Sequence, residues 1–322
     1  MPNNTKFLIC AAGIFVCYFY FGILQEKITR GQYSYEAVDE NGVSTKVEER
    51  YTYALALVFV QCFVNYFFAK GMLYVWPHGE DTTPKLYCAS SALTYLLAMV
   101  CSNMALQWVS YPTQVVGKAG KPIPVMVLGV LIGRKSYPMK KYFFVLMIVI
   151  GVILFMYKEK ASTKQSDTSF GLGELLILLS LTMDGLTGAV QERIKAEAKP
   201  TAQQMMLGMN SFACMFLAVA LLLSGELIKF IEFVSRHPIV VTHISLLALA
   251  GALGQLFIFL TVTEFGPLPC SVITTTRKFF TVLGSVMLFG NVLSARQWLG
   301  AVTVFTGLFL DVFFSKGPPK KK

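Results

Sequence analysis

Ten apolar stretches, each long enough to cross a lipid bilayer, constrain the fold of this chain more than any other feature. An α-helix rises about 1.5 Å per residue, so about 20 apolar residues cross a hydrocarbon core roughly 30 Å thick. Of the 322 residues, 55% are hydrophobic and only 14% are charged, which is more apolar surface than a soluble core can bury. We therefore predict an all-α membrane protein whose ten transmembrane helices lie at 6–25, 51–76, 86–108, 112–133, 139–157, 171–190, 205–225, 239–262, 268–289 and 296–315.

The ten spans divide into two repeats of five, the first at 1–160 and the second, with a basic C-terminal tail, at 161–322. A shift of 157 residues places Lys121 of the fourth span on Lys278 of the ninth. Because five is an odd number, the second repeat would enter the membrane from the opposite side, as in secondary transporters with inverted repeats. The connections are short, and none of them has room for a soluble domain.

Four basic residues lie inside two of these spans, Lys118 and Lys121 in the fourth and Arg277 and Lys278 in the ninth. Each cation near the membrane centre costs roughly 2.5–3.5 kcal/mol on insertion scales, so four of them indicate a functional need. An anion with several phosphate oxygens would balance their charge. The Arg277 guanidinium can hold two oxygens at once, and the lysines supply point charges.

The alternative explanations are that these cations extend to a membrane interface or pair with embedded acids such as Glu26, Asp184 or Glu264. Their position in mid-span argues against the first explanation, and a shortage of embedded carboxylates argues against the second. The residues around the first lysine pair can interrupt the helix and free backbone groups to line a cavity: Gly117, Gly120, Pro122 and Pro124.

Other polar residues of the spans are candidate substrate contacts. Tyr18 offers an aromatic face on which a base can stack, although an interfacial anchor explains it equally well. Gln25 and Glu26 offer hydrogen bonds to a base or sugar, or an ion pair that holds the basic site when it is empty. The remaining candidates are Asn103, Gln107, Tyr111, Gln114, Gln255, Thr274 and Thr275. Polar residues in a span also join helices, and we expect the sixth span, with Ser180, Asp184, Gly185 and Gly188, to serve mainly in helix packing.

The sequence argues against several function classes. The seven cysteines lie in or beside apolar runs without paired spacing, which is typical of small core residues. The three histidines are too dispersed for a metal site. Catalytic motifs such as HExxH and GxSxG are absent from the sequence, so we expect neither an enzyme nor a cofactor. The net charge of +10 indicates orientation in a bilayer and an internal anion site rather than a nucleic-acid partner.

Four segments carry a family resemblance: YFYFGILQEKITRG, VSYPTQVVGKAGKPIPVM, LTMDGLTG and FGPLPCSVITTTRKFFT. The chain resembles the UDP-galactose-transporter-related branch of the nucleotide-sugar transporter family, in the drug/metabolite transporter superfamily, from about Phe15 to Asp311. The resemblance implies ten helices in two inverted halves and a place in the endoplasmic reticulum membrane. This branch includes an exchanger of ATP and ADP.

The resemblance also implies roles for particular residues. The lysines of GKxxKP, here Lys118 and Lys121, and the basic pair of TTTRKFFT, here Arg277 and Lys278, would hold the phosphates. Gln114 and Glu26 would join them in the site.

We therefore expect a membrane antiporter of the endoplasmic reticulum that exchanges cytosolic ATP for luminal ADP by alternating access, with both termini in the cytosol. The alternative is an antiporter of the same fold that exchanges UDP-galactose or UDP-glucose for UMP, because both ligand classes combine a base, a ribose and phosphates. A third alternative is a membrane scaffold that does not transport. The tenth span, apolar from Trp298 to Leu310, would face lipid or the second copy of a homodimer.

Overall fold

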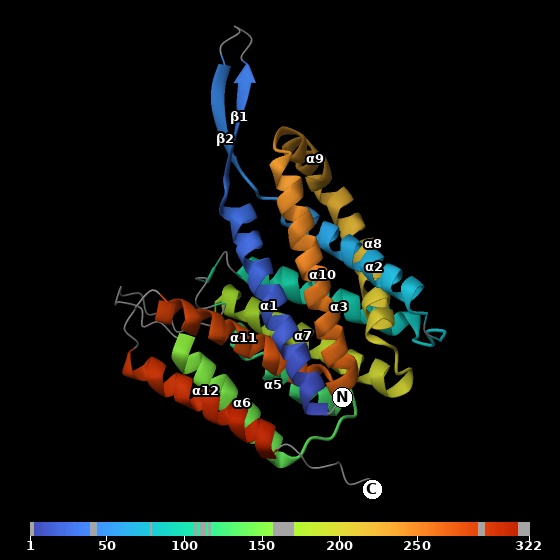
Figure 1. Cartoon of the computed structure of the whole chain (residues 1–322), viewed down its shortest axis with the longest axis vertical. Helices are drawn as coiled ribbons and strands as arrows, with labels where there is room; N and C mark the ends of the chain where they lie inside the picture. Colours follow the sequence, from blue (N-terminus) through green and yellow to red (C-terminus); the bar gives the residue numbers. More distant parts are fainter. Residues whose placement is uncertain are drawn as a thin grey trace. The chain divides into compact units, whose positions relative to one another are not determined.

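The computed structural model describes residues 3–38, 44–77, 79–105, 108–109, 114, 117–156, 171–288 and 294–314. Within these residues the chain is helical apart from one two-stranded sheet, as the predicted all-α class requires (Figure 1). Among the residues that the structure describes, six helical segments are long and apolar enough to cross a membrane: Thr5–Thr29, Ala54–Val75, Lys85–Ala105, Leu172–Glu197, Ala202–Ser224 and Ile239–Phe265. In the described part of the fourth predicted span, the apolar helix Pro122–Leu131 is shorter than a full crossing.

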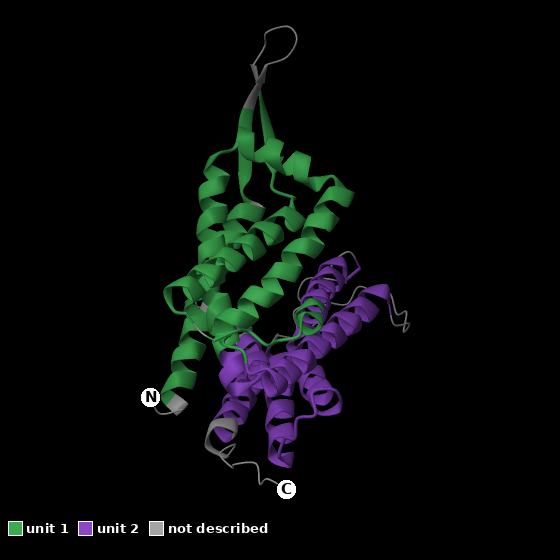
Figure 2. Cartoon of the chain, turned by 90° about the vertical axis from the view of Figure 1, so that its right-hand side faces the viewer, with its two compact units in different colours: residues 1–89, 200–260 green, residues 90–199, 261–322 purple. Residues whose placement is uncertain are grey.

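The helices form two compact units, drawn in green and purple in Figure 2. Unit 1 comprises residues 1–89 and 200–260, with α1 (Asn3–Arg30), β1 (Gln32–Val38), β2 (Ser44–Arg50), α2 (Ala54–Val75), α8 (Ala202–Ser224), α9 (Glu226–Arg236) and most of α10 (Ile239–Phe265). Unit 2 comprises residues 90–199 and 261–322, with most of α3 (Lys85–Ala105), α5 (Pro122–Leu131), α6 (Met139–Met156), α7 (Leu172–Glu197), α11 (Pro267–Leu288) and α12 (Ala295–Phe314).

In unit 1, α2 packs along α8, and α1 packs on α10. A Cβ atom at Gly13 of α1 would lie 2.5 Å from the Phe257 ring, and one at Gly254 of α10 would lie 2.8 Å from the Tyr18 ring. Glycine at these two positions therefore lets an aromatic side chain of the partner helix rest on the backbone.

A β-hairpin and a short helix were not predicted from the sequence. β1 and β2 pair antiparallel from Gln32 with Arg50 to Val38 with Ser44. Tyr33 of the hairpin packs edge-on against Phe233 of α9, with ring centroids 5.4 Å apart. The alternation of tyrosines with polar residues at the start of β1 is typical of a half-buried strand and was the available signal.

Both ends of α8 follow from local chemistry. α8 begins with a capping box in which the backbone N–H of Gln204 donates to Thr201 Oγ1 and the backbone N–H of Thr201 donates to Gln204 Oε1. It ends at Gly225, whose φ of 64° lies in the left-handed region that glycine tolerates best. The chain turns there and starts α9.

In unit 2, α5 packs on α7, and α6 packs on α12. A Cβ atom at Gly185 of α7 would lie 2.9 Å from the carbonyl oxygen of Pro124, and one at Gly188 would lie 3.0 Å from the Val125 side chain. The expected packing role of the small residues in the sixth span is therefore confirmed at these two glycines.

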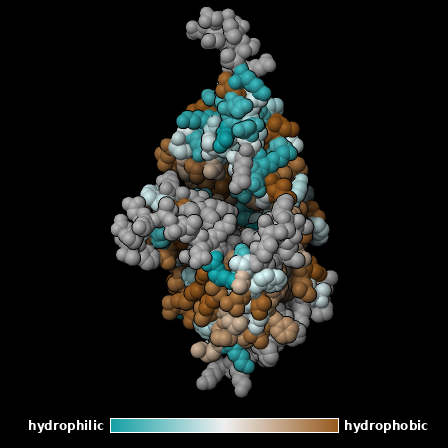
Figure 3. Space-filling view, turned by 90° about the vertical axis from the view of Figure 1, so that its left-hand side faces the viewer, coloured by the Kyte–Doolittle hydropathy of each residue, from teal (hydrophilic) through white to brown (hydrophobic). Residues whose placement is uncertain are grey.

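Large apolar side chains remain exposed on the helices. Figure 3 shows apolar residues over much of one face of the molecule and hydrophilic residues near the hairpin. On α12 the exposed apolar residues are Trp298, Leu299, Val302, Phe305 and Phe309. Such surface is expected of a chain in contact with lipid. All seven cysteines are free, and five are buried, as expected of small core residues.

Candidate anion-binding site

The fourth predicted span is interrupted at its lysines. Residues 117–119 form a short helical turn, and α5 begins at Pro122 with Lys121 as its N-cap residue. The Lys121 amide bonds to the Lys118 carbonyl oxygen at 3.2 Å, a spacing of three residues that is tighter than an α-helix. The expected interruption of the span 112–133 beside its glycines and prolines is therefore confirmed.

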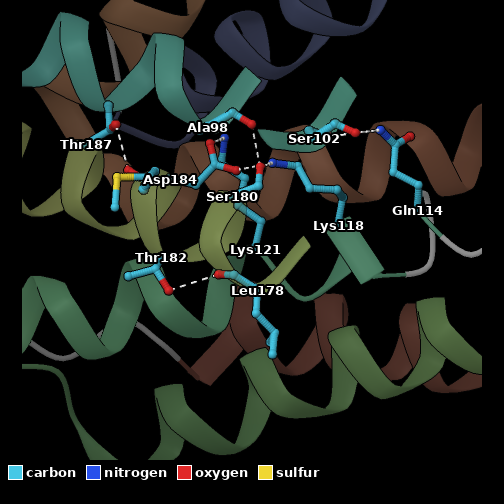
Figure 4. A network of polar contacts seen from close by, with 11 residues as sticks. Ala98, Ser102, Gln114, Lys118, Lys121, Leu178, Ser180, Thr182, Asp184 and Thr187 are labelled. Carbon is cyan, nitrogen blue, oxygen red and sulfur yellow. Dashed lines mark hydrogen bonds and ion pairs between the residues drawn. The ribbon is translucent and has the colours of Figure 1, made fainter. Parts of the chain in front are cut away.

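Two lysines share one carboxylate at this interruption (Figure 4). Lys118 Nζ lies 2.5 Å from Asp184 Oδ2, and Lys121 Nζ lies 3.0 Å from Asp184 Oδ1. Lys118 Nζ also donates to Ser180 Oγ at 2.7 Å, and Ser180 donates in turn to the Ala98 carbonyl oxygen of α3. The close approach of α7 to α5 at Gly185 and Gly188 brings Asp184 within reach of both ammonium groups.

Asp184 lines the pocket beside these lysines, whereas the sequence led us to expect that it serves mainly in helix packing. Asp184 was one of the acids considered as a partner of the buried cations, and its single carboxylate meets both Lys118 and Lys121. The three cations of the described lining still outnumber this carboxylate. Ser180 and Asp184 are four residues apart on α7 and therefore lie on one helix face, which was the available signal.

A pocket of about 230 Å³ opens beside this cluster within unit 2. The side chain of Asp184 is 8% exposed and that of Lys118 is 14% exposed, whereas that of Lys121 is 35% exposed. The lining residues are Tyr95, Ala98, Met99, Ser102, Asn103, Lys118, Lys121, Asp184, Thr274, Thr275 and Arg277. They include three cations and one carboxylate, so their formal charge is +2. This volume is below the roughly 300–1,000 Å³ of common ligand pockets, so it suits part of a nucleotide better than a whole one.

The structure brings together six of the predicted site residues in this pocket: Lys118, Lys121, Asn103, Thr274, Thr275 and Arg277. Gln114 lies beside it, where its amide Nε2 donates to the Ser102 carbonyl oxygen and to Ser102 Oγ. Gln114 therefore supports a lining residue and is not itself part of the lining.

The remaining predicted residues are not among those that line the described pocket. Lys278 belongs to α11, but its side chain lies outside what the structure describes, and Gln107 and Tyr111 lie outside the described residues altogether. Four predicted residues belong to unit 1: Tyr18, Gln25, Glu26 and Gln255.

Gln255 takes part in a chain of amides that joins three helices of unit 1. Asn210 of α8 donates to Gln255 Oε1 of α10 at 2.9 Å, and Asn65 of α2 donates to Asn210 Oδ1 at 3.4 Å. Asn65 and Asn210 are each only 2% exposed. These contacts favour a role between helices for Gln255, which was one of the two explanations left open by the sequence.

A second buried carboxylate lies two turns further along α7. Glu192 Oε2 lies 3.7 Å from Lys135 Nζ, and Glu192 Oε1 accepts a hydrogen bond from the Tyr137 hydroxyl at 3.4 Å. Burial, and then the Glu192 carboxylate, raises the pKa of Tyr137, so this phenol stays protonated and remains a donor. Glu192 is not among the residues that line the pocket.

Comparisons with known proteins agree with a membrane carrier. The model of the UAA transporter family matches residues 6–315. The chain is 59% identical over 320 residues to the solute carrier family 35 member B1 homolog of Drosophila melanogaster, covering 99% of this chain and 93% of that protein. It is 52% identical over 320 residues to solute carrier family 35 member B1 of Xenopus tropicalis, covering 99% of this chain and 96% of that protein.

One protein of known crystal structure has the same fold at 11% identity, with a TM-score of 0.62 over 96% of this chain and 99% of its own. The Drosophila and Xenopus relatives are solute carriers and not enzymes, as the sequence analysis expected.

Proposed function

The chain belongs to the UAA transporter family, and from that premise we propose that it is an antiporter that exchanges cytosolic ATP for luminal ADP across the endoplasmic reticulum membrane. The observation that carries this proposal is the pocket of unit 2, in which Lys118, Lys121 and Arg277 meet among membrane helices. Cations embedded at this depth are expensive to keep without an anionic ligand.

The chemistry of the pocket favours a chain of phosphates. Lys121 is the most exposed member of the lysine cluster and offers a point charge to an incoming oxygen. The Arg277 guanidinium can hold two oxygens of one phosphate or of neighbouring phosphates. We assign Lys278 to the same phosphate site because it follows Arg277 in the segment TTTRKFFT. The base and ribose would then extend beyond this small pocket.

We propose that the carrier has two inverted repeats, 1–160 and 161–322, and that it works by alternating access. Helix pairs within the units support this architecture. In unit 2 the third span, α3, meets the sixth, α7, through Thr94 and Thr187, whose hydroxyls lie 2.8 Å apart. In unit 1 the eighth span, α10, meets the first, α1. Two repeats of five relate the third span to the eighth and the first span to the sixth. The pair α3–α7 in unit 2 therefore corresponds to the pair α10–α1 in unit 1.

The pocket also combines the two halves of the sequence, with Lys118 and Lys121 from the first and Thr274, Thr275 and Arg277 from the second. A site at the meeting of two repeats is the arrangement that alternating access requires. We propose that the repeats rock around this site while the nucleotide is held there.

We place both termini in the cytosol, since the basic residues of 134–141 and of the tail then lie on the cytosolic side. The hairpin follows the first span and α9 follows the seventh, so both would lie in the lumen. The hairpin and α9 pack together through Tyr33 and Phe233, so they must lie on the same side of the membrane. This agrees with the proposed topology, in which six spans, an even number of crossings, separate the two segments.

Exchange in liposomes tests the proposal. Uptake of labelled ATP by the purified, reconstituted protein should require ADP or ATP inside, and external UDP-galactose, UDP-glucose and UMP should compete poorly. The double variant Lys121→Ala with Lys278→Ala should lose uptake. A matched control is Lys70→Ala, which removes an exposed lysine of α2 that lies over the Tyr66 ring in unit 1. Undiminished uptake in the double variant would refute the phosphate site, and stronger competition by UDP-sugars than by ADP would refute the substrate.

A further inference from the structure

Asp184 has an unusual place in a pocket proposed to hold an anion. Its carboxylate carries the only negative charge among the residues that line the described pocket, and each of its oxygens meets a different lysine. A carboxylate in this position occupies the same positive groups that a phosphate would use, so the two anions compete.

The two lysines differ in how firmly they are held. Lys118 has a second partner in Ser180, which is itself bonded to α3, and its side chain is largely buried. Lys121 contacts Asp184 at 3.0 Å and is the more exposed of the two. Lys121 can therefore turn toward the pocket while Lys118 keeps Asp184 in place.

We propose that Asp184 is a resident counter-ion that the phosphate chain displaces from Lys121, and that it tunes the relative affinity for ATP and ADP. The inference rests on the proposed function, since it concerns the same site. When the pocket is empty, Asp184 neutralises part of the lysine charge. When a nucleotide is bound, Asp184 stays nearby on Lys118 and weakens the hold on every phosphate.

The effect on ATP and ADP must differ because ATP carries one more negative charge. A fixed negative charge near the site opposes ATP more than ADP and thus brings the two affinities closer together. An exchanger benefits from such balance, because it must bind one nucleotide and release the other on each side. Removing the charge should tighten both nucleotides, favour ATP over ADP and slow release.

Asp184→Asn tests this in the reconstituted exchanger. We expect KM to fall for both nucleotides, with the preference for ATP over ADP rising by about threefold to fivefold, as one charge roughly 8 Å away in a partly hydrated site would produce. The maximal exchange rate should fall as release slows. Asp184→Glu keeps the charge and should stay near the wild-type preference.

Glu192→Gln is the matched control, because it removes a second buried carboxylate from the same helix outside the pocket. It should leave the preference between ATP and ADP unchanged. An equal rise of KM for both nucleotides in Asp184→Asn, or the same change of preference in Glu192→Gln, would overturn the proposal in favour of a merely structural role.

A rescue experiment covers the case in which Asp184→Asn does not fold. Lys118→Gln alone should weaken nucleotide binding, because the lining then loses a cation. Adding Asp184→Asn removes the matching anion, avoids an unpaired buried charge and should restore a large part of the affinity. A double variant that binds no better than Lys118→Gln would also overturn the proposal.

Inorganic pyrophosphate separates this inference from the proposed function. It should stabilise the purified protein thermally, and Asp184→Asn should lower the concentration needed. If the wild-type protein fails to exchange ATP for ADP but this shift occurs, the counter-ion role stands and the nucleotide assignment falls. If the wild-type protein exchanges ATP for ADP but Asp184→Asn does not lower the pyrophosphate concentration needed, the nucleotide assignment stands and the counter-ion role falls.

Discussion

Two polar clusters, one in each unit, are buried between helices, and they differ in charge. In unit 1 the cluster is neutral, and Asn65, Asn210 and Gln255 are joined by amide hydrogen bonds. In unit 2 two ammonium groups share the Asp184 carboxylate, and a pocket adjoins them. Helix association explains the neutral cluster completely. The charged cluster retains positive charge that no helix packing requires, and on this difference we base the proposal that it is the binding site.

The largest effect should come from making the charged cluster neutral like the other one. The triple variant Lys118→Gln, Lys121→Gln, Asp184→Asn replaces the ions by amides of similar size and leaves no unpaired charge behind. We expect it to fold with a stability near that of the wild type and to lose exchange by about 100-fold or more, since several charge contacts to phosphate are lost together. Thermal unfolding and labelled uptake check the two expectations. A folded triple variant that still transports would remove the distinction between the clusters.

A smaller effect should follow from separating the helices that hold the charged cluster. In Gly185→Ala the new methyl group meets the backbone of Pro124 at 2.9 Å, so α5 must move away from α7. We expect a loss of about 1–3 kcal/mol in stability from this overpacking and weaker nucleotide binding. Gly71→Ala is the control, because a Cβ atom at Gly71 of α2 has no atom within 4 Å. If Gly185→Ala and Gly71→Ala had the same stability and the same nucleotide affinity, this close approach would not position the site.

The smallest effect on transport should come from breaking the neutral cluster. Asn210→Ala leaves the amides of Asn65 and Gln255 without their shared partner, which should lower stability by about 1–3 kcal/mol. Exchange per folded molecule and the preference among nucleotides should stay close to those of the wild type. Labelled uptake per folded molecule would measure exchange, and nucleotide titrations of thermal unfolding would measure the preference. Loss of the nucleotide response at full stability would instead make unit 1's cluster part of the site.

The cations could be predicted from the sequence because their signal is local. A lysine inside an apolar run is costly wherever the rest of the chain lies, so the sequence alone indicates Lys118, Lys121 and Arg277 as site residues. The glycines and prolines beside the lysines likewise predicted the interruption at Lys121.

The partner of the lysines could not be predicted in the same way. Asp184 lies more than sixty residues from Lys118 in the sequence, and three embedded acids were equally available. The choice among them depends on the packing of α5 against α7, which Gly185 and Gly188 permit through contacts that the sequence does not specify. The hairpin was missed for a related reason, because Tyr33 and Tyr51 are stabilised by contacts with α9 and not by a strong local signal.

Thermal stabilisation of the purified protein by adenosine, AMP, ADP and ATP tests most directly whether the basic pocket binds phosphates. A ligand that binds only the folded protein raises its free energy of unfolding, and with it the unfolding temperature, with the logarithm of the ligand concentration divided by Kd. We predict stabilisation by ADP and ATP, little by adenosine, and none by any of the four in the triple variant. Adenosine that stabilises the wild type as strongly as ATP, or a triple variant with an undiminished response, would contradict this prediction.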